Sequence, residues 1–462
     1  MTQVSSVTHA ISINPATGEQ IGHYPFQSAS DLDAALARAA AGFSVWRRTP
    51  VEQRAQALVV LARTLRDNAA TMANMISVEM GKPVTQARGE IEKCAQLCEW
   101  YAEHGPAMLT AEPTLVEGGK ARIEYRPLGP ILAVMPWNFP IWQVLRGAVP
   151  ALIAGNTYVL KHAPNVMGSA YLLRDALQRA NFPEGVFEVI NVTPDGVSTA
   201  IADPRIAAVT LTGSVRAGMA IGAQAGAAMK KCVLELGGSD PFIVLNDADL
   251  DEAVKAAVIG RYQNTGQVCA AAKRLIVEQG IVEEFTRKFV EATRQLVVGD
   301  PLAADTYIGP MARFDLRDEL DQQVRDTLEE GATLLLGGKK AEGPGNYYEP
   351  TVFADVTDQM TSFKQELFGP VASIITARDA AHALALANDS EFGLASTIYT
   401  RNVELAQQMA GELETGGVFI NGYCASDPRV TFGGVKKSGF GRELSHFGVR
   451  EFCNAQTVWL DR

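Results

Sequence analysis

Short apolar runs alternate with longer amphipathic segments over most of the chain. The runs are rich in β-branched residues and are bounded by Gly, Asp or Pro, whereas the segments between them repeat apolar residues at helical spacing. This rhythm is typical of parallel sheets built from βαβ units, and the simplest arrangement is two α/β domains that meet near residue 237. We expect strands in the ranges 131–137, 157–161, 187–192, 206–214, 231–238, 241–246, 274–279, 333–338, 372–377, 396–400 and 416–421.

Three further segments can be assigned from local signals. Residues 30–47 are predicted to form a helix, with Ser30 as the N-cap and Asp33 three residues later. Residues 114–129 alternate apolar and polar side chains around a Gly-Gly pair, which predicts a β-hairpin inside the α/β chain. The tail 455–462 could supply a third strand to that hairpin.

Charge and composition narrow the possible partners. The chain has 462 residues and a formal net charge of −11, without a run of five or more Lys or Arg, which argues against nucleic acid or an anionic membrane as a partner. An anionic substrate would need a local Arg or Lys. The N-terminus lacks a secretory pattern, and the six cysteines are dispersed, so we expect a cytoplasmic protein with reduced thiols.

Several common signatures are missing from the sequence. It contains no G-x-G-x-x-G dinucleotide fingerprint, no Walker A sequence and no G-x-S-x-G nucleophile elbow. The six histidines show no metal-ligand spacing, so neither a metal site nor a Ser-His triad is predicted.

A cysteine in the stretch "YQNTGQVCAAAKR" is the first candidate for chemistry. Cys269 lies in a polar run with a Gly, where backbone N–H groups and partial exposure favour the thiolate form that a nucleophile needs. Taken alone, the same cysteine could be a small buried side chain, because free Cys is usually buried.

Two other polar residues stand where chemistry is plausible. Glu235 lies in an apolar strand before a Gly-Gly pair, so its pKa is expected to rise towards the range of a general base, unless it faces water at a sheet edge. Asn138 follows a strand in "MPWNFP" and could donate to a developing oxyanion, or could be an ordinary turn residue. The stretch "LTGSVRAG" begins a helix whose N–H groups could hold a pyrophosphate.

Together these motifs resemble the aldehyde dehydrogenase superfamily over nearly the whole chain. The matching stretches, in the family's order, are "NPATGE", "EMGKP", "PLGPILAVMPWNFP", "LTGSVRAG", "LELGGSDPFIVL", "NTGQVCAAAKR", "QELFGPV" and "FGGVKKSGFGRE". The resemblance implies an α/β fold of two doubly wound parallel-sheet domains plus a small β oligomerisation element. It places a dinucleotide-binding domain in 1–113 and 129–236, a catalytic domain in 237–440, and the oligomerisation element of a homodimer or homotetramer in 114–128 and 441–462.

The resemblance also implies a mechanism. Cys269 matches the nucleophile that attacks the aldehyde, Asn138 and the Cys269 N–H match the oxyanion donors, and Glu235 matches the base that hydrolyses the thioester. The presence of Glu235 argues against the acylating branch, which uses coenzyme A instead of water. Residues that match the family's cofactor contacts are Trp137, Lys161, Gly213, Ser214, Glu366 and Phe368.

One departure bears on the choice of cofactor. Many relatives carry a Glu three residues after Lys161 that binds the adenosine ribose, and this chain has Pro164 there. Losing that carboxylate removes its repulsion of a 2′-phosphate, with which Lys161 could pair. We therefore predict that NAD is preferred and NADP is tolerated.

The substrate is expected to be succinate semialdehyde, because the chain looks like the compact bacterial enzymes that oxidise it. The predicted substrate residues are Trp142, Arg146, Gln263, Asp427 and Arg429. Other semialdehyde dehydrogenases carry Arg in place of Gln263, so either predicted Arg is a candidate to bind the substrate carboxylate, although each could form a salt bridge instead. The alternatives are a broad aliphatic or amino-aldehyde dehydrogenase, or a non-catalytic scaffold of the same fold.

Overall fold

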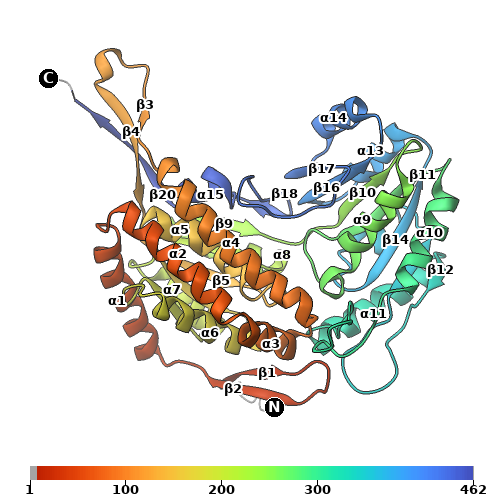
Figure 1. The fold of residues 1–462 in the computed structure, drawn as a ribbon, viewed down its shortest axis with the longest axis horizontal. Helices are drawn as coiled ribbons and strands as arrows, with labels where there is room; N and C mark the ends of the chain where they lie inside the picture. The colour runs from red at the N-terminus through yellow and green to blue at the C-terminus, as the bar shows by residue number, and fades with distance from the viewer. Residues whose placement is uncertain (1–7, 461–462) are drawn as a thin grey trace.

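The computed structural model describes residues 8–460, which form two α/β bodies side by side (Figure 1). Each body is built around one largely parallel sheet, so the predicted α/β class is confirmed. The strand order is β19-β9-β8-β5-β6-β7 in the first sheet and β12-β13-β14-β11-β10-β16-β17 in the second. The chain passes from the first sheet to the second after Glu235 and before Asp240.

The first sheet is parallel apart from the short edge strand β19. Its strands are β5 (Pro130–Met135), β6 (Thr157–His162), β7 (Phe187–Ile190), β8 (Ala208–Thr212), β9 (Lys231–Glu235) and β19 (Gly439–Phe440). The helices of this body are α1 (Ala29–Trp46), α2 (Val51–Asp67), α3 (Ala69–Met80), α4 (Val84–Met108), α5 (Trp142–Ala154), α6 (Met167–Arg179), α7 (Pro194–Ala202), α8 (Val215–Ala227) and α15 (Ser445–Glu451).

The second sheet is parallel apart from its edge strand β12. Its strands are β10 (Asp240–Val244), β11 (Ala272–Glu278), β12 (Thr333–Leu336), β13 (Thr351–Ala354), β14 (Val371–Ala377), β16 (Ala395–Tyr399) and β17 (Gly417–Ile420). Its helices are α9 (Leu250–Tyr262), α10 (Val282–Arg294), α11 (Phe314–Glu329), α12 (Thr361–Lys364), α13 (Ala380–Asn388) and α14 (Val403–Glu412).

A small antiparallel sheet extends away from the first body (Figure 1). It consists of β3 (Glu112–Pro113), β4 (Ala121–Pro127) and β20 (Cys453–Trp459), and β20 pairs with β4 along its whole length. The predicted third strand is confirmed, but the first strand of the predicted hairpin is wrong: residues 114–116 form no strand, and β3 lies just before them. The last two residues of the predicted third strand lie outside the described part of the chain.

The local predictions are wrong in two details. The N-cap of α1 is Ser28, which forms a capping box with Asp31, so the helix begins before the predicted Ser30. The sequence analysis also misses the N-terminal hairpin of β1 (His9–Ile13) and β2 (Gln20–Pro25), along with β13 and the two-residue strands β15 (Phe392–Gly393) and β18 (Val435–Lys436). Most of these lack a long apolar run, so periodicity gave no signal for them.

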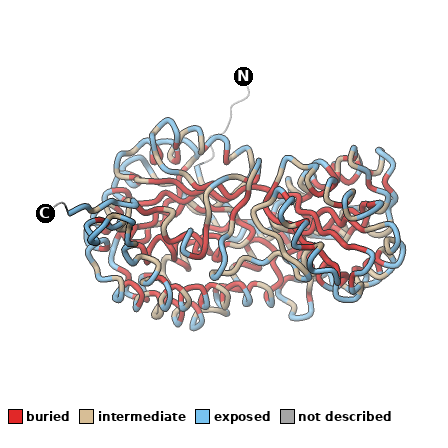
Figure 2. Tube along the Cα trace, turned by 90° about the horizontal axis from the view of Figure 1, so that it is seen from above, coloured by how far each residue is buried: buried red, intermediate tan, exposed pale blue. Residues whose placement is uncertain are grey.

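Burial on both faces explains why the central strands could be recognised. All five residues of β10 are buried, as are five of the six in β5. Figure 2 shows buried strands running through the middle of both bodies, with exposed segments around them. A strand covered by helices on both faces needs apolar side chains at successive positions, which produces the continuous runs in the sequence. None of the helices within residues 8–460 is long and apolar enough to cross a membrane.

Candidate active site

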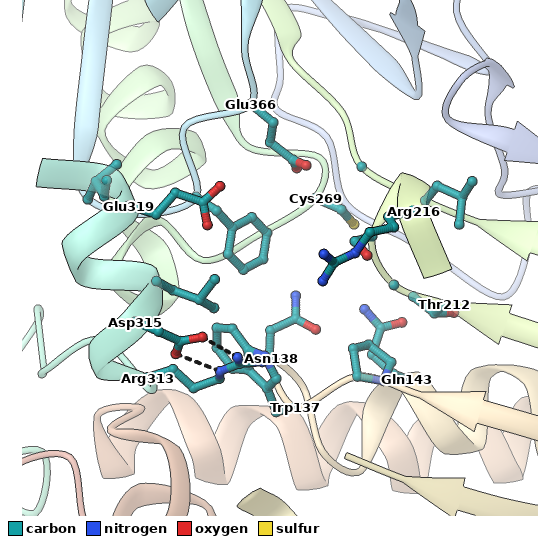
Figure 3. A pocket seen from close by; sticks show the side chains of 18 of the residues that line it. Trp137, Asn138, Gln143, Thr212, Arg216, Cys269, Arg313, Asp315, Glu319 and Glu366 are labelled. Atoms are coloured by element: carbon teal, nitrogen blue, oxygen red, sulfur yellow. Dashed lines mark hydrogen bonds and ion pairs between the residues drawn. The ribbon is translucent and has the colours of Figure 1, made fainter. Parts of the chain in front are cut away.

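A cavity of about 610 Å³ opens between the two bodies (Figure 3). Loops after β5, β8 and β9 contribute to its wall from the first body, and the loop before β11 contributes from the second. Carboxyl ends of parallel strands are where open α/β sheets place ligands. The predicted site residues that line the cavity are Trp137, Asn138, Gly213, Ser214, Cys269, Glu366 and Phe368.

The loop before Cys269 is held in an unusual backbone conformation. Asn264, Thr265 and Gly266 have φ angles of 54°, 58° and 71°, which the first two residues adopt only against a steric cost. A Cβ on Gly266 would lie 2.2 Å from the Gly369 carbonyl oxygen, so this position requires glycine. The Asn264 side chain donates to the backbone oxygen of Asn138 at 2.8 Å, which ties the nucleophile loop to the candidate oxyanion donor.

A buried ammonium anchors the same loop from the other side. Lys273 Nζ donates to the carbonyl oxygens of Gly238, Val268 and Cys269 at 2.5, 3.0 and 2.6 Å, and it contacts Glu366 Oε1 at 3.0 Å. Its side chain is only 1% exposed, so these contacts replace the water that the cation loses. The Glu366 carboxylate also accepts from the Gly238 N–H at 3.1 Å, which fixes it in the cavity.

The turn that carries Asn138 is fixed by a second buried pair. Glu90 on α4 accepts from the N–H groups of Ile141 and Trp142 at the start of α5, both at 2.9 Å, and forms an ion pair with Lys82. A carboxylate at a helix N-terminus is favoured by the exposed N–H groups and the helix dipole. The Asn138 side-chain N–H donates to the Gln267 backbone oxygen at 3.1 Å, and the Asn138 side-chain oxygen Oδ1 has no hydrogen-bond partner among residues 8–460.

Glu235 is buried and its carboxyl oxygens have no hydrogen-bond partner within the described residues. Burial, reinforced by the nearby Glu443 carboxylate, raises the pKa of Glu235 to about 8, against the opposing charges of Arg146 and Arg442. A carboxyl group with free oxygens and a pKa in this range can exchange a proton near neutral pH, as a general base must.

Burial and nearby positive charges shift the pKa of the Cys269 thiol in opposite directions. Burial raises the pKa of the thiol to about 11, while the positive charges of Arg146 and Lys273 oppose that rise. The thiolate therefore depends on these two cations or on a proton acceptor. Arg146 is close enough to Cys269 and Glu235 that both affect its ionisation, so the thiol and the carboxyl share one electrostatic environment.

The predicted cofactor residues occupy different parts of the site. Ser214 is the N-cap of α8, and Arg216 on that helix lines the cavity (Figure 3) without an ion-pair partner among residues 8–460. Helix N–H groups beside a free guanidinium suit a diphosphate. The Phe368 and Trp137 rings pack edge to face, with 5.7 Å between the ring centres. Lys161 is the penultimate residue of β6 and pairs with Val134 of β5, but it does not line the cavity.

The predicted substrate cations are already paired. Arg146 is buried and forms an ion pair with Glu443, and Arg429 is paired with Asp427 at 2.7 Å while remaining largely exposed. Each Arg therefore forms a salt bridge within the chain, which is the predicted alternative to binding the substrate carboxylate. Gln263 is exposed at the end of α9. Trp142 is buried at the start of α5 and does not line the cavity.

Sequence reasoning missed several residues that shape the site. Lys273 stands four residues after Cys269 in "CAAAKR", and its nearness in sequence could have suggested a role. Arg216 and Arg313 also line the cavity, the latter paired with Asp315 (Figure 3), but neither differs in the sequence from an ordinary surface Arg.

Comparison with known proteins gives a consistent result over the whole length of the chain. Residues 2–458 match the aldehyde dehydrogenase family model. The chain is 66% identical to succinate semialdehyde dehydrogenase [NAD(P)+] Sad of Escherichia coli (strain K12), covering 99% of both chains. It is 48% identical to succinate-semialdehyde dehydrogenase [NADP(+)] of Mycobacterium avium (strain 104), covering 97% and 96%.

Solved structures agree with these sequence matches. A structure of succinic semialdehyde dehydrogenase from Streptococcus pyogenes in complex with NADP+ superposes with a TM-score of 0.96 at 35% identity. The match covers 98% of this chain and all of the other.

We predict that Lys273→Met slows alkylation of Cys269 by iodoacetamide. Removing the buried cation raises the thiol pKa, so less thiolate is present, and we expect a rate roughly three- to tenfold lower near neutral pH. Peptide mass spectrometry measures the rate at this cysteine separately from the other five. The control is Lys255→Met, which removes an exposed ammonium on α9 and should change the rate by less than about twofold. An unchanged or faster rate in Lys273→Met would contradict the role given to this charge.

Proposed function

Because the chain belongs to the aldehyde dehydrogenase family, we propose that it oxidises succinate semialdehyde to succinate with NAD(P). The observation that carries this proposal is one cavity in which Cys269, Asn138 and Glu366 meet, beside a buried Glu235 with free carboxyl oxygens. The names of the similar enzymes support the choice of substrate.

The first half of the reaction forms a covalent adduct. The Cys269 thiolate attacks the aldehyde carbon, and the carbonyl oxygen becomes an oxyanion. The Asn138 side-chain N–H and the Cys269 backbone N–H stabilise this charge, which is a large contribution in a site that excludes water. A bound nicotinamide cofactor would supply the hydride acceptor, and loss of the hydride would convert the adduct on Cys269 into a thioester.

The second half of the reaction releases the acid. Glu235 accepts a proton from water, which attacks the thioester carbonyl and expels the Cys269 thiolate. The free carboxyl oxygens of Glu235 make it available for this step, and its raised pKa matches the task. A hydrolytic outcome needs no coenzyme A.

The cavity suits a nicotinamide dinucleotide. The N-terminus of α8 with Ser214 and Arg216 provides donors for the diphosphate, while Glu366 and Phe368 stand near Cys269 for the nicotinamide ribose. Lys161 has no ion-pair partner among residues 8–460, and burial lowers the pKa of its ammonium. Preference for NAD over NADP stays a prediction, since the relatives' names include both cofactors.

The oligomer is proposed to be a homodimer or homotetramer built on the small sheet. Its strands extend from the first body, and Leu115 beside them is fully exposed. A projecting strand edge with exposed apolar side chains is suited to pairing with another copy.

One observation favours a second candidate function. Both predicted substrate cations are paired with carboxylates of the chain, which is what a broad aliphatic or amino-aldehyde dehydrogenase would allow. A scaffold without turnover is the third possibility, and the reactive residues of the cavity weigh against it.

The proposal is tested by reduced-nicotinamide formation with a panel of aldehydes. We expect succinate semialdehyde to exceed butanal, benzaldehyde and betaine aldehyde in kcat/KM by at least about tenfold, or about 1.4 kcal/mol of transition-state preference. Equal rates with neutral aldehydes would support the second candidate instead. No turnover with any aldehyde would favour the scaffold.

Glu235→Gln is expected to stop turnover after one hydride transfer. The variant should release about one reduced cofactor for each Cys269 in a burst, while steady-state turnover falls roughly a hundredfold or more. Protonation has the same consequence, so wild-type turnover should fall as pH drops below about 8, the pKa of Glu235. Stopped-flow absorbance measures both phases, with the exposed Glu391→Gln as control. Turnover within about tenfold of wild type, or loss of the burst, would contradict this role.

Lys161→Met is expected to discriminate between the two cofactors. Loss of an ammonium that pairs with the 2′-phosphate should lower kcat/KM for NADP roughly tenfold or more, and for NAD much less. Kinetics with each cofactor at saturating aldehyde give the ratio, and the exposed Lys120→Met serves as control. If both cofactors are affected equally, Lys161 does not read the 2′-phosphate.

A further inference from the structure

A lysine on α4 lies beside the predicted substrate residues. Lys93 Nζ is 4.0 Å from the centre of the Trp142 ring and 3.0 Å from the Ser426 hydroxyl oxygen. Trp142 begins α5, directly after the Asn138 turn, and Ser426 precedes Asp427 in the loop after β17. Three elements distant in sequence therefore converge on one ammonium.

This ammonium lacks the partner that a half-buried cation normally has. None of the carboxylates in residues 8–460 lies within ion-pair distance of Lys93, and the neighbouring Asp427 is bound to Arg429. A cation that is partly removed from water is stabilised by an anion, and the described residues supply none within ion-pair distance. Lys93 thus differs from both predicted substrate cations, which are each paired.

Lys93 is linked to the candidate site through its neighbours. Its contact Trp142 begins α5, the helix that follows the Asn138 turn. Cys424 is close enough to both Lys93 and Cys269 that each affects its pKa, and Arg146 affects the pKa of Lys93 and of Cys269.

We propose that Lys93 is a specificity-determining residue that binds the distal carboxylate of an aldehyde acid such as succinate semialdehyde. This inference rests on the proposed function and identifies which cation of the chain recognises the acid. The Ser426 hydroxyl and the Trp142 ring position the ammonium, and the incoming carboxylate supplies the missing anion. A hydrogen bond between an ammonium and a carboxylate is stronger than one between neutral groups.

The ionisation of Lys93 gives the selectivity a pH dependence. Burial lowers the pKa of its ammonium to about 8, and the charged and titratable groups that face it are Cys94 from α4, Arg146 from α5, and Cys424 and Asp427 from the loop. The ammonium is present below this pH and lost above it. Recognition of a carboxylate should therefore weaken as pH rises through about 8.

The test compares kcat/KM for succinate semialdehyde with that for butanal, which has the same chain length and no carboxylate. Lys93→Met should lower this ratio roughly ten- to hundredfold, mainly through KM for the semialdehyde. Lys93→Arg keeps the charge and should retain most of the ratio. The matched control is Arg88→Met, which removes an exposed cation of the same helix. It should change the ratio by less than about twofold.

The outcomes separate this inference from the proposed function. If the wild type does not prefer the semialdehyde, the proposed substrate is wrong. If the wild type prefers it and Lys93→Met keeps the ratio, the substrate stands and the role of Lys93 is contradicted. If Lys93→Met fails to fold, the wild type is measured instead, as the ratio of kcat/KM for succinate semialdehyde to that for butanal between about pH 7 and about pH 9. A ratio that falls with rising pH supports the inference. A ratio that stays constant contradicts it. Since Cys269 and Glu235 serve both substrates, their titration cancels in the ratio.

Discussion

The site depends on one buried ammonium more than on any other group. Lys273 binds the carbonyl oxygen of Cys269, the carbonyl oxygen of Gly238 and the carboxylate of Glu366 at once. These three residues belong to the nucleophile loop, the connection between the two sheets, and the loop after α12. A buried ammonium is stable only when each of its N–H groups donates a hydrogen bond. Moving any of the three segments away would leave Lys273 without an acceptor, and the free-energy penalty of that loss holds the segments together.

The same burial that orders the site also holds its reactive groups in neutral form. Protein atoms around Cys269 and Glu235 raise the pKa of both, and the positive charges nearby only partly compensate. Both groups raise the pKa of Arg146, and its guanidinium in turn favours the ionised form of each. The ion pair of Arg146 with Glu443 belongs to this environment, so its removal would change the chemistry as well as the packing.

The fold could be predicted from the sequence because strands covered on both faces give continuous apolar runs. The roles proposed for Cys269, Glu235 and Asn138 came from the resemblance to a family, because each residue taken alone left an ordinary structural role open. Partners set by tertiary packing leave no such trace. Arg146 meets Glu443, which is 297 positions away, and Lys93 meets Ser426 from a helix whose sequence resembles an ordinary amphipathic one. Sequence reasoning therefore named two cations that are paired with carboxylates and overlooked Lys93, which has no ion-pair partner among residues 8–460.

The most direct test of the account is to look for the acyl group on Cys269. Enzyme turning over succinate semialdehyde would be quenched with acid at a pH below that at which Glu235 ionises, where hydrolysis of the thioester is slow. Peptide mass spectrometry then locates any added mass. The account predicts a succinyl group on the peptide that contains Cys269 and on no other cysteine. Sustained turnover with Cys269 unmodified, or an acyl group on a different residue, would contradict it.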